Sequence, residues 1–211
     1  MNEGIESFRE RLEGRLANVG LSLGAEDADR LERYYRLLVR WNAKINLTSL
    51  QLENCPASTL DRLFVEPLLA AELVPDRPLV WFDLGSGGGS PAIPIKVIRP
   101  AASLTMVDSV AKKGVFLREA SRNAELAGVI VITARIEELP GLYSADLADL
   151  LTIRAVRIDP KVIETASYLL KPGGRLLHFG SGVDVAPVGF KAETRRELMA
   201  PSDSLTVLER S

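Results

Sequence analysis

The chain has 211 residues, of which 46% are hydrophobic and 26% are charged, and its formal net charge at pH 7 is -2. This length fits one main hydrophobic core with a small helical attachment, and the composition excludes disordered and fibrous proteins. Because the net charge is close to zero, a nucleic-acid role would have to rest on local basic patches.

Three segments near the N-terminus carry apolar residues at helical spacing, and they predict helices over 5–19, 26–46 and 59–73. In the second segment the apolar residues recur three or four positions apart. They predict one buried stripe, made of Leu31, Tyr34, Leu38, Trp41 and Ile45. We therefore expect residues 1–75 to form a helical extension.

The chain lacks any run of eighteen or more apolar residues, and its first fifteen residues are rich in charge. These features predict neither membrane insertion nor export, and therefore a cytoplasmic protein. The single cysteine, Cys55, cannot form a disulfide within the chain, which fits a reducing compartment. Together with the one histidine, His178, it excludes a Cys/His metal cluster, and we expect no bound metal.

From residue 79 onward, short apolar runs alternate with longer amphipathic stretches, a texture typical of strand–helix–strand units. The runs predict five strands, over 79–84, 103–107, 129–133, 149–154 and 175–179. The remaining runs are too short for another crossover helix and predict a closing antiparallel hairpin, from 183–188, 190–198 and 205–208. We therefore expect residues 76–211 to form one α/β domain.

A glycine-rich loop, Gly85 to Gly89, follows the first predicted strand. Glycines there let the backbone turn tightly and let a ligand approach it, which indicates a nucleoside ligand with Gly85 and Gly87 as contacts. A dinucleotide fingerprint needs a third glycine where this chain has Ser90, so a pyrophosphate is the weaker alternative. Asp83 would face the cleft and attract a cationic sulfonium or amino group, which favours S-adenosylmethionine.

Two further segments complete the predicted nucleoside site. Asp108 ends the second strand about twenty residues after the loop, where its carboxylate can accept hydrogen bonds from both ribose hydroxyls. Ile136 and Glu137 follow the third strand, where main-chain amides and one side chain can hold an adenine. A tight turn without ligand is the alternative for the glycine loop, and a solvated charged turn is the alternative for 134–138.

Several motifs occur in the order and at the intervals of a known family. They are Trp41-Asn42 with Asn46-Leu47-Thr48, the loop region 83–95, Val107-Asp108-Ser109 with Lys112-Lys113, Arg135-Ile136-Glu137-Glu138, and Arg154-Ala155-Val156. Together they resemble the small-subunit ribosomal RNA guanine-N7 methyltransferases, also called glucose-inhibited division protein B, over most of the chain. The glycine loop alone would fit almost any methyltransferase, so the specificity lies in the combination.

The resemblance implies a Rossmann-like class I S-adenosylmethionine-dependent methyltransferase sheet with an N-terminal helical extension. It implies cofactor contacts at Gly85, Ser90, Asp108, Ile136 and Glu137. Arg154 would lie at the mouth of the cleft, beside both cofactor and substrate. The expected partner is 16S ribosomal RNA or the small ribosomal subunit, with no membrane involved and the protein acting as a monomer.

The chain departs from the family pattern at two places. The family's arginine-histidine pair in the third helix is Arg62-Leu63 here, and the aspartate-serine pair that follows is Glu66-Pro67. A lysine that the family carries after the fifth strand is also missing. Since these groups would line the side where RNA approaches, the departures concern substrate recognition more than cofactor binding.

The implied reaction does not need acid–base catalysis. The lone pair of guanine N7 is available at neutral pH, so its attack on a sulfonium methyl needs no general base and depends on positioning. We hypothesise that Arg154 is the catalytic residue and orients the target base or a flanking phosphate. The alternative is a structural salt bridge with Asp83 or Glu137. His178 is predicted to be a packed strand residue.

A basic stripe runs beside the buried stripe of the second helix, and it is made of Arg30, Arg33, Arg36, Arg40 and Lys44. We hypothesise that it contacts RNA phosphates and delivers RNA to the cleft, with a row of solvated charges as the alternative. Two other functions stay open for the protein. One is a small-molecule methyltransferase on the same sheet, and the other is a catalytically silent cofactor-binding or ribosome-associated module.

Overall fold

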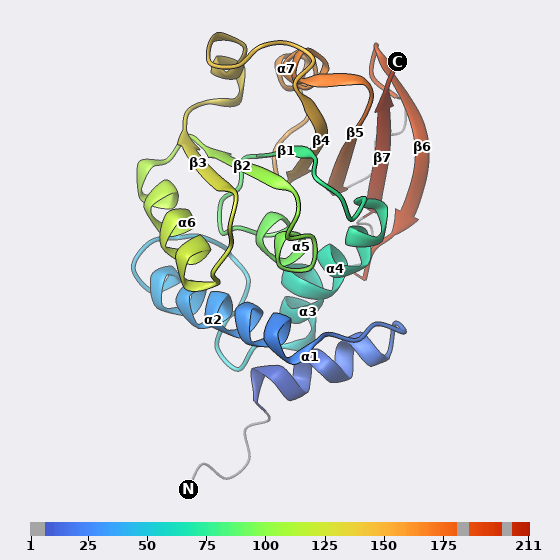
Figure 1. Ribbon diagram of the computed structural model, residues 1–211. Coiled ribbons are helices and arrows are strands. Elements are labelled where there is room, and N and C mark those ends of the chain that lie inside the picture. Colours follow the sequence, from blue (N-terminus) through green and yellow to red (C-terminus); the bar gives the residue numbers. More distant parts are fainter. Residues whose placement is uncertain (1–6, 181–185, 200–203) are drawn as a thin grey trace, which may run out of the picture.

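The computed structural model describes residues 7–180, 186–199 and 204–211, and it shows a seven-stranded sheet with helices on both faces (Figure 1). The strands are β1 (Val80–Leu84), β2 (Ser103–Asp108), β3 (Val129–Thr133), β4 (Ala148–Arg154), β5 (Leu170–Gly180), β6 (Phe190–Glu197) and β7 (Ser204–Arg210). Their order in the sheet is β3-β2-β1-β4-β5-β7-β6. The first five strands are parallel, whereas β7 and β6 close the sheet as an antiparallel pair.

The predicted α/β fold, its five parallel strands and the closing hairpin are therefore confirmed. The largest difference is in β5, which begins five residues before the predicted start. Leu170 already pairs with Ala148, and the ladder resumes at Arg175 after a break in register where Gly173 has a φ of +77°. His178 is buried within this strand, as predicted. Residues 183–185 of the predicted hairpin lie outside the described residues.

The N-terminal extension is helical, as predicted. Its helices are α1 (Phe8–Ala17), α2 (Ala25–Asn42), α3 (Ala57–Leu60), η1 (Asp61–Val65), α4 (Glu66–Ala70) and η2 (Ala71–Leu73). The predicted end of α2 is four residues too late. The side chain of Asn42 accepts hydrogen bonds from the amides of Leu47 and Thr48, at 2.9 and 3.0 Å, and so turns the chain away from the helix axis.

The third predicted helix is one continuous helical segment whose type changes along its length, rather than a regular α-helix. A π-helical turn, η1, stands between α3 and α4, and a 3-10 turn, η2, follows. Pro67 has no amide hydrogen, so it cannot donate to the carbonyl of Leu63. In the π turn, the amide of Glu66 bonds to Asp61 instead of Arg62. Both irregularities release carbonyl groups beside the site described below.

The core is divided by the sheet into two clusters. On one face, the extension packs with α5 (Ala92–Ile98), α6 (Ala111–Asn123) and sheet residues such as Trp81. On the other face, α7 (Pro160–Leu169) and η3 (Ile136–Gly141) cover Phe82 and Leu84. Successive side chains of β1 thus point to opposite faces of the sheet, as expected for a strand that is buried on both faces. Figure 1 shows α5 lying between α2 and the strands.

The predicted buried stripe of α2 lies against this first core, with Tyr34 and Leu38 fully buried and Trp41 partly buried. Within the described residues, no helix combines the length and the apolar character needed to cross a membrane. The division of the chain at residue 75 stays a prediction.

Candidate active site

The glycine-rich loop lies at the carboxyl end of β1, where neighbouring parallel strands also end. The amides of Gly85 and Ser86 both donate to the carbonyl of Val107 at the end of β2, at 2.8 and 2.9 Å. Gly85 has a φ of +77°, and a Cβ added there would lie 2.3 Å from Cγ2 of Val156. The position therefore requires glycine for its backbone conformation and for space.

Asp108 fastens this loop to the next strand. One carboxylate oxygen accepts from the amide of Gly87 at 2.9 Å, and the other accepts from the amide of Val110 at 2.9 Å. The Asp108 side chain is nearly buried but forms part of a cavity wall. Because each carboxylate oxygen can accept a further hydrogen bond, Asp108 can still receive donors from a ligand in that cavity.

A first cavity of about 510 Å³ lies over the ends of β1, β2, β3 and β4. Four of the residues predicted to bind a cofactor line it, namely Gly85, Asp108, Ile136 and Glu137. Its walls combine the Asp108 carboxylate with apolar groups from Ile136, Val110, Val156 and Val162. We call this space the adenosyl cavity, because its shape and lining suit a nucleoside.

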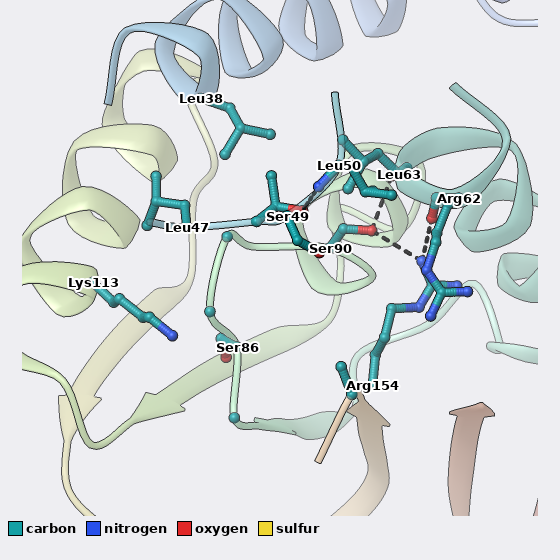
Figure 2. Close-up of a pocket in the computed structure, with 15 residues that line it drawn as sticks. Leu38, Leu47, Ser49, Leu50, Arg62, Leu63, Ser86, Ser90, Lys113 and Arg154 are labelled. Atoms are coloured by element: carbon teal, nitrogen blue, oxygen red, sulfur yellow. Dashed lines mark hydrogen bonds between the residues drawn. The ribbon is translucent and has the colours of Figure 1, made fainter. Parts of the chain in front are cut away.

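A second cavity of about 330 Å³ lies between the loop and the N-terminal extension (Figure 2). It brings together three further predicted residues, Gly87, Ser90 and Arg154. One wall is apolar and comes from Leu38, Leu47, Leu50 and Leu63, so Leu63, at the family's histidine position, lines it. We call this space the acceptor cavity. It shares Gly85, Lys113 and Ala155 with the adenosyl cavity, so the two spaces adjoin.

Arg154 is held in the wall of the acceptor cavity by contacts on several sides. Its guanidinium forms a 2.8 Å ion pair with the carboxylate of Glu66, which is fully buried. It also donates to the carbonyl of Arg62 and lies 4.4 Å above the ring centroid of Phe179. The proposed ion-pair partners Asp83 and Glu137 were wrong, because Glu66 from the extension supplies the carboxylate.

The irregular third helix explains how Arg154 and Ser90 are bound. The carbonyls released by the π turn and by Pro67 belong to Arg62 and Leu63. Arg154 donates to the first, and the hydroxyl of Ser90 donates to the second at 3.0 Å, as Figure 2 shows. The proline that departs from the family pattern thus leaves an acceptor for Ser90 in the loop. This contact ties the extension to the glycine-rich loop.

Asp83 lies beneath the loop, where its side chain is only 1% exposed, and it lines neither cavity. The expectation that it faces the cleft openly was therefore wrong. One carboxylate oxygen accepts from the hydroxyl of Thr152, which in turn accepts from the indole N–H of Trp81. The other oxygen is buried, and no hydrogen bond reaches it from any of the described residues. Burial raises the pKa of Asp83 to about 6, although the nearby hydroxyls of Ser86 and Thr152 and the charge of Arg154 oppose this shift.

Sequence reasoning missed the residues that join the extension to the loop. Tyr34 was predicted only as a core residue, yet its hydroxyl donates to the carbonyl of Gly88 at 2.6 Å. Burial raises the pKa of Tyr34 far above its ordinary value, so the hydroxyl stays protonated and remains a donor. A hydroxyl group within this otherwise apolar stripe is the signal that could have indicated this contact. For Glu66, a carboxylate inside an apolar helix carried the same kind of signal.

The strand order, the glycine loop after β1 and the acid that ends β2 together define a Rossmann-like class I methyltransferase. A family model described as rRNA small subunit methyltransferase G matches residues 27–183. The chain belongs to this family, as the motifs predicted.

Individual relatives agree with the family assignment. The protein named ribosomal RNA small subunit methyltransferase G in Syntrophotalea carbinolica is 35% identical, over 96% of this chain and 98% of the relative. Its namesake in Myxococcus xanthus is 33% identical, over 92% of this chain and 83% of the relative. Among solved structures, a SAM dependent methyltransferase from Aquifex aeolicus shares the fold with a TM-score of 0.54. That match has 14% identity and covers 72% of this chain and 96% of the other.

Proposed function

We propose that this protein transfers a methyl group from S-adenosylmethionine to N7 of a guanine in 16S ribosomal RNA of the small ribosomal subunit. The observation that carries the proposal is the pair of adjoining cavities around the glycine loop. A cofactor whose nucleoside fills the adenosyl cavity would extend past Gly85 and present its far end to the acceptor cavity. The family membership supports ribosomal RNA as the substrate class.

The residues present fit S-adenosylmethionine. At Gly87 an added Cβ would meet only the carbonyl oxygen of Gly85, at 3.8 Å, so the missing side chain leaves room for a ligand beside the main chain. Asp108 would accept the ribose hydroxyls, and Ile136 would pack against the adenine. The buried, unpaired oxygen of Asp83 leaves negative charge beneath the loop, where it would favour a cationic cofactor over a phosphate. When bound, the cofactor would supply an electrophilic methyl group on its sulfonium.

The lining of the acceptor cavity suits a nucleophile that needs no deprotonation. Among the described residues that line it, there is no aspartate, glutamate or histidine. The polar groups are hydroxyls and cations, including Ser49, Ser90 and Lys113. A guanine N7 already carries its lone pair, so the site would act by orienting the base and excluding water. Positioning of this kind can lower a barrier by about 7 to 11 kcal/mol.

In this proposal Arg154 is a positioning residue rather than a group that binds the target base. Its terminal nitrogens already donate to Glu66 and to the carbonyl of Arg62. Through these bonds it would hold the third helical segment against β4 and fix Ser90 beside the loop. The loss of Arg154 would therefore disturb the shape of both cavities.

The proposal is tested by methyl transfer to RNA. Purified protein is incubated with methyl-labelled S-adenosylmethionine and small ribosomal subunits from cells that lack the protein. We expect label in the ribosomal RNA, inhibition by S-adenosylhomocysteine, and loss of transfer in Asp108→Ala. Asp29→Ala, which removes an exposed acid remote from the cavities, should behave as the wild type. Absence of label from RNA incubated with the wild-type protein would overturn the proposal.

A protein with this substrate would act in the cytoplasm, and its monomeric state stays a prediction.

A further inference from the structure

The basic stripe of α2 does not act as one surface, because its first part is neutralised by acids. Arg30 pairs with Glu26 at 2.6 Å, and Arg36 pairs with Glu32 at 2.5 Å, both within the helix. Arg33 forms a 2.7 Å ion pair with Glu125, which follows α6. These three arginines face fixed carboxylates, which would have to be displaced before RNA phosphates could bind.

The second part of the stripe is different. Arg40 and Lys44 are exposed, and neither forms an ion pair with an acid in residues 7–180, 186–199 or 204–211. At the start of α6, Lys112 is exposed and Lys113 is half-buried, and within those ranges neither forms an ion pair with an acid. Four cations at two helix ends are therefore left without counter-charges from the described chain.

These two helix ends lie side by side. Arg33 reaches Glu125 beyond the end of α6, whereas the Trp41 indole donates to Glu119 at 3.1 Å and its ring contacts Phe116. Positions later in α2 thus face positions earlier in α6, so the two helices run antiparallel. Arg40, in the last turn of α2, therefore lies toward the beginning of α6, and Lys44 follows two residues after the end of α2. Glu119, an acid of α6, accepts from the Trp41 indole and forms no ion pair with these cations among the described residues.

The junction of these helix ends is also the entrance to the site. Lys113 lines both cavities, and Figure 2 shows its ammonium group directed toward the glycine loop near Ser86. Leu47, three residues after Lys44, also lines the acceptor cavity. A strand of nucleic acid whose base entered the acceptor cavity would therefore pass its phosphates over this junction.

We infer that Arg40, Lys44, Lys112 and Lys113 form an RNA-docking cluster that binds the phosphates flanking the target nucleotide, and this inference rests on the proposed function. Phosphate contacts supply orientation and most of the affinity without reading sequence. In a chain with a net charge of -2, a local group of unpaired cations is where such contacts can form. The predicted docking stripe is thus corrected to its C-terminal half and extended onto α6.

The test compares two double variants, in α2 and just after it, with the same change in charge. Arg40→Gln with Lys44→Gln removes two cluster cations, and Arg30→Gln with Arg36→Gln removes two paired arginines. Binding of a small-subunit ribosomal RNA fragment is measured from 50 to 200 mM salt, with S-adenosylhomocysteine affinity as the check on folding. Each lost phosphate contact lowers the slope of log K against log salt by about 0.7 on single-stranded RNA.

We expect the cluster variant to bind RNA more weakly, with a slope shallower by about 1.4. Its deficit should therefore shrink about sevenfold between the two salt concentrations, whereas the paired-arginine variant should keep the wild-type slope. Equal slopes in the two variants would overturn the inference while leaving methyl transfer intact. Failure of the proposed function has a separate signature, because wild-type protein would then transfer no label.

Discussion

The guanidinium of Arg154 and the carboxylate of Glu66 lie 2.8 Å apart across 88 positions of sequence. Arg154 ends β4 and Glu66 begins α4, so the pair joins the sheet to the N-terminal extension at the acceptor cavity. Both side chains are buried, with 7% and 0% of their surfaces exposed. Glu66-Pro67 stands where the resemblance places an aspartate-serine pair. The first position is thus still an acid, whereas the second is a proline in place of a serine.

The first prediction concerns this pair. Glu66→Gln should lower the free energy of unfolding by about 3 to 5 kcal/mol, because it leaves the buried charge of Arg154 without its carboxylate. Glu72→Gln is the matched control, since Glu72 pairs with Arg196 at 3.6 Å on the surface and should cost less than about 1 kcal/mol. Denaturant unfolding measures both values. Equal losses in the two variants would show that the buried pair contributes no special stability.

The second prediction concerns the hydroxyl of Tyr34. Tyr34→Phe should weaken cofactor binding several-fold, because the carbonyl of Gly88 loses the donor that fixes the loop. Tyr35→Phe is the control, since its hydroxyl donates to the carbonyl of Leu52, away from both cavities. Each variant should lose about 1 kcal/mol of stability. Titration with S-adenosylhomocysteine should separate them, and identical affinities would refute the role of Tyr34.

The third prediction uses two glycines with the same backbone angle. Gly85 and Gly173 both have a φ of +77°, but only Gly85 has a neighbour, Val156, in the space of a Cβ. Gly173→Ala should cost about 1 to 2 kcal/mol from backbone strain alone. Gly85→Ala should cost more and should abolish cofactor binding, because the clash displaces the loop. Thermal unfolding and cofactor titration give the comparison, and a Gly85→Ala protein with normal affinity would contradict the assigned site.

The fourth prediction follows from the pKa of Asp83. Its folded value of about 6 exceeds its ordinary value of 3.8, so the folded protein binds this proton more tightly than the unfolded chain. Through this group, the free energy of unfolding falls as pH rises from about 4 to 6 and stays lowered above that range. Asp83→Asn should therefore stabilise the protein at pH 7.5, by up to about 3 kcal/mol.

The same substitution should weaken binding of S-adenosylmethionine more than binding of S-adenosylhomocysteine. The two ligands differ by the methyl group and the sulfonium charge, and Asp83 would favour that charge from beneath the loop. Calorimetric titration of both ligands, in wild type and Asp83→Asn, measures the ratio of their affinities. An unchanged ratio would mean that Asp83 has only a structural role.

The sheet could be predicted from sequence because each strand is a short apolar run between breakers, as in 79–84 and 103–107. The spacing of apolar residues within each segment, and the glycines and prolines between segments, are local properties of the sequence. The pitch changes around Asp61 and Pro67 were missed for the opposite reason. A π turn is stable only where the released carbonyls find donors, and those donors, Arg154 and Ser90, come from distant segments.

The site was predictable to a similar extent. Asp108 ends a strand, and Gly85 and Ile136 follow strands. The carboxyl ends of parallel strands meet at one edge, so the grouping of these residues around a cavity was foreseeable. The direction of Asp83 and the partner of Arg154 were not, since both depend on how the extension packs on the sheet. A buried charge must find a counter-charge, but spacing along the chain does not say which one.

The central claim is transfer to guanine N7, and the modified nucleoside tests it most directly. Small-subunit ribosomal RNA labelled by the wild-type protein is digested to nucleosides, and the labelled product is separated and identified by its mass and fragmentation. The account predicts a single labelled product, 7-methylguanosine, from one position in the RNA. Label on a ribose, on a ring carbon or on an exocyclic nitrogen would contradict it.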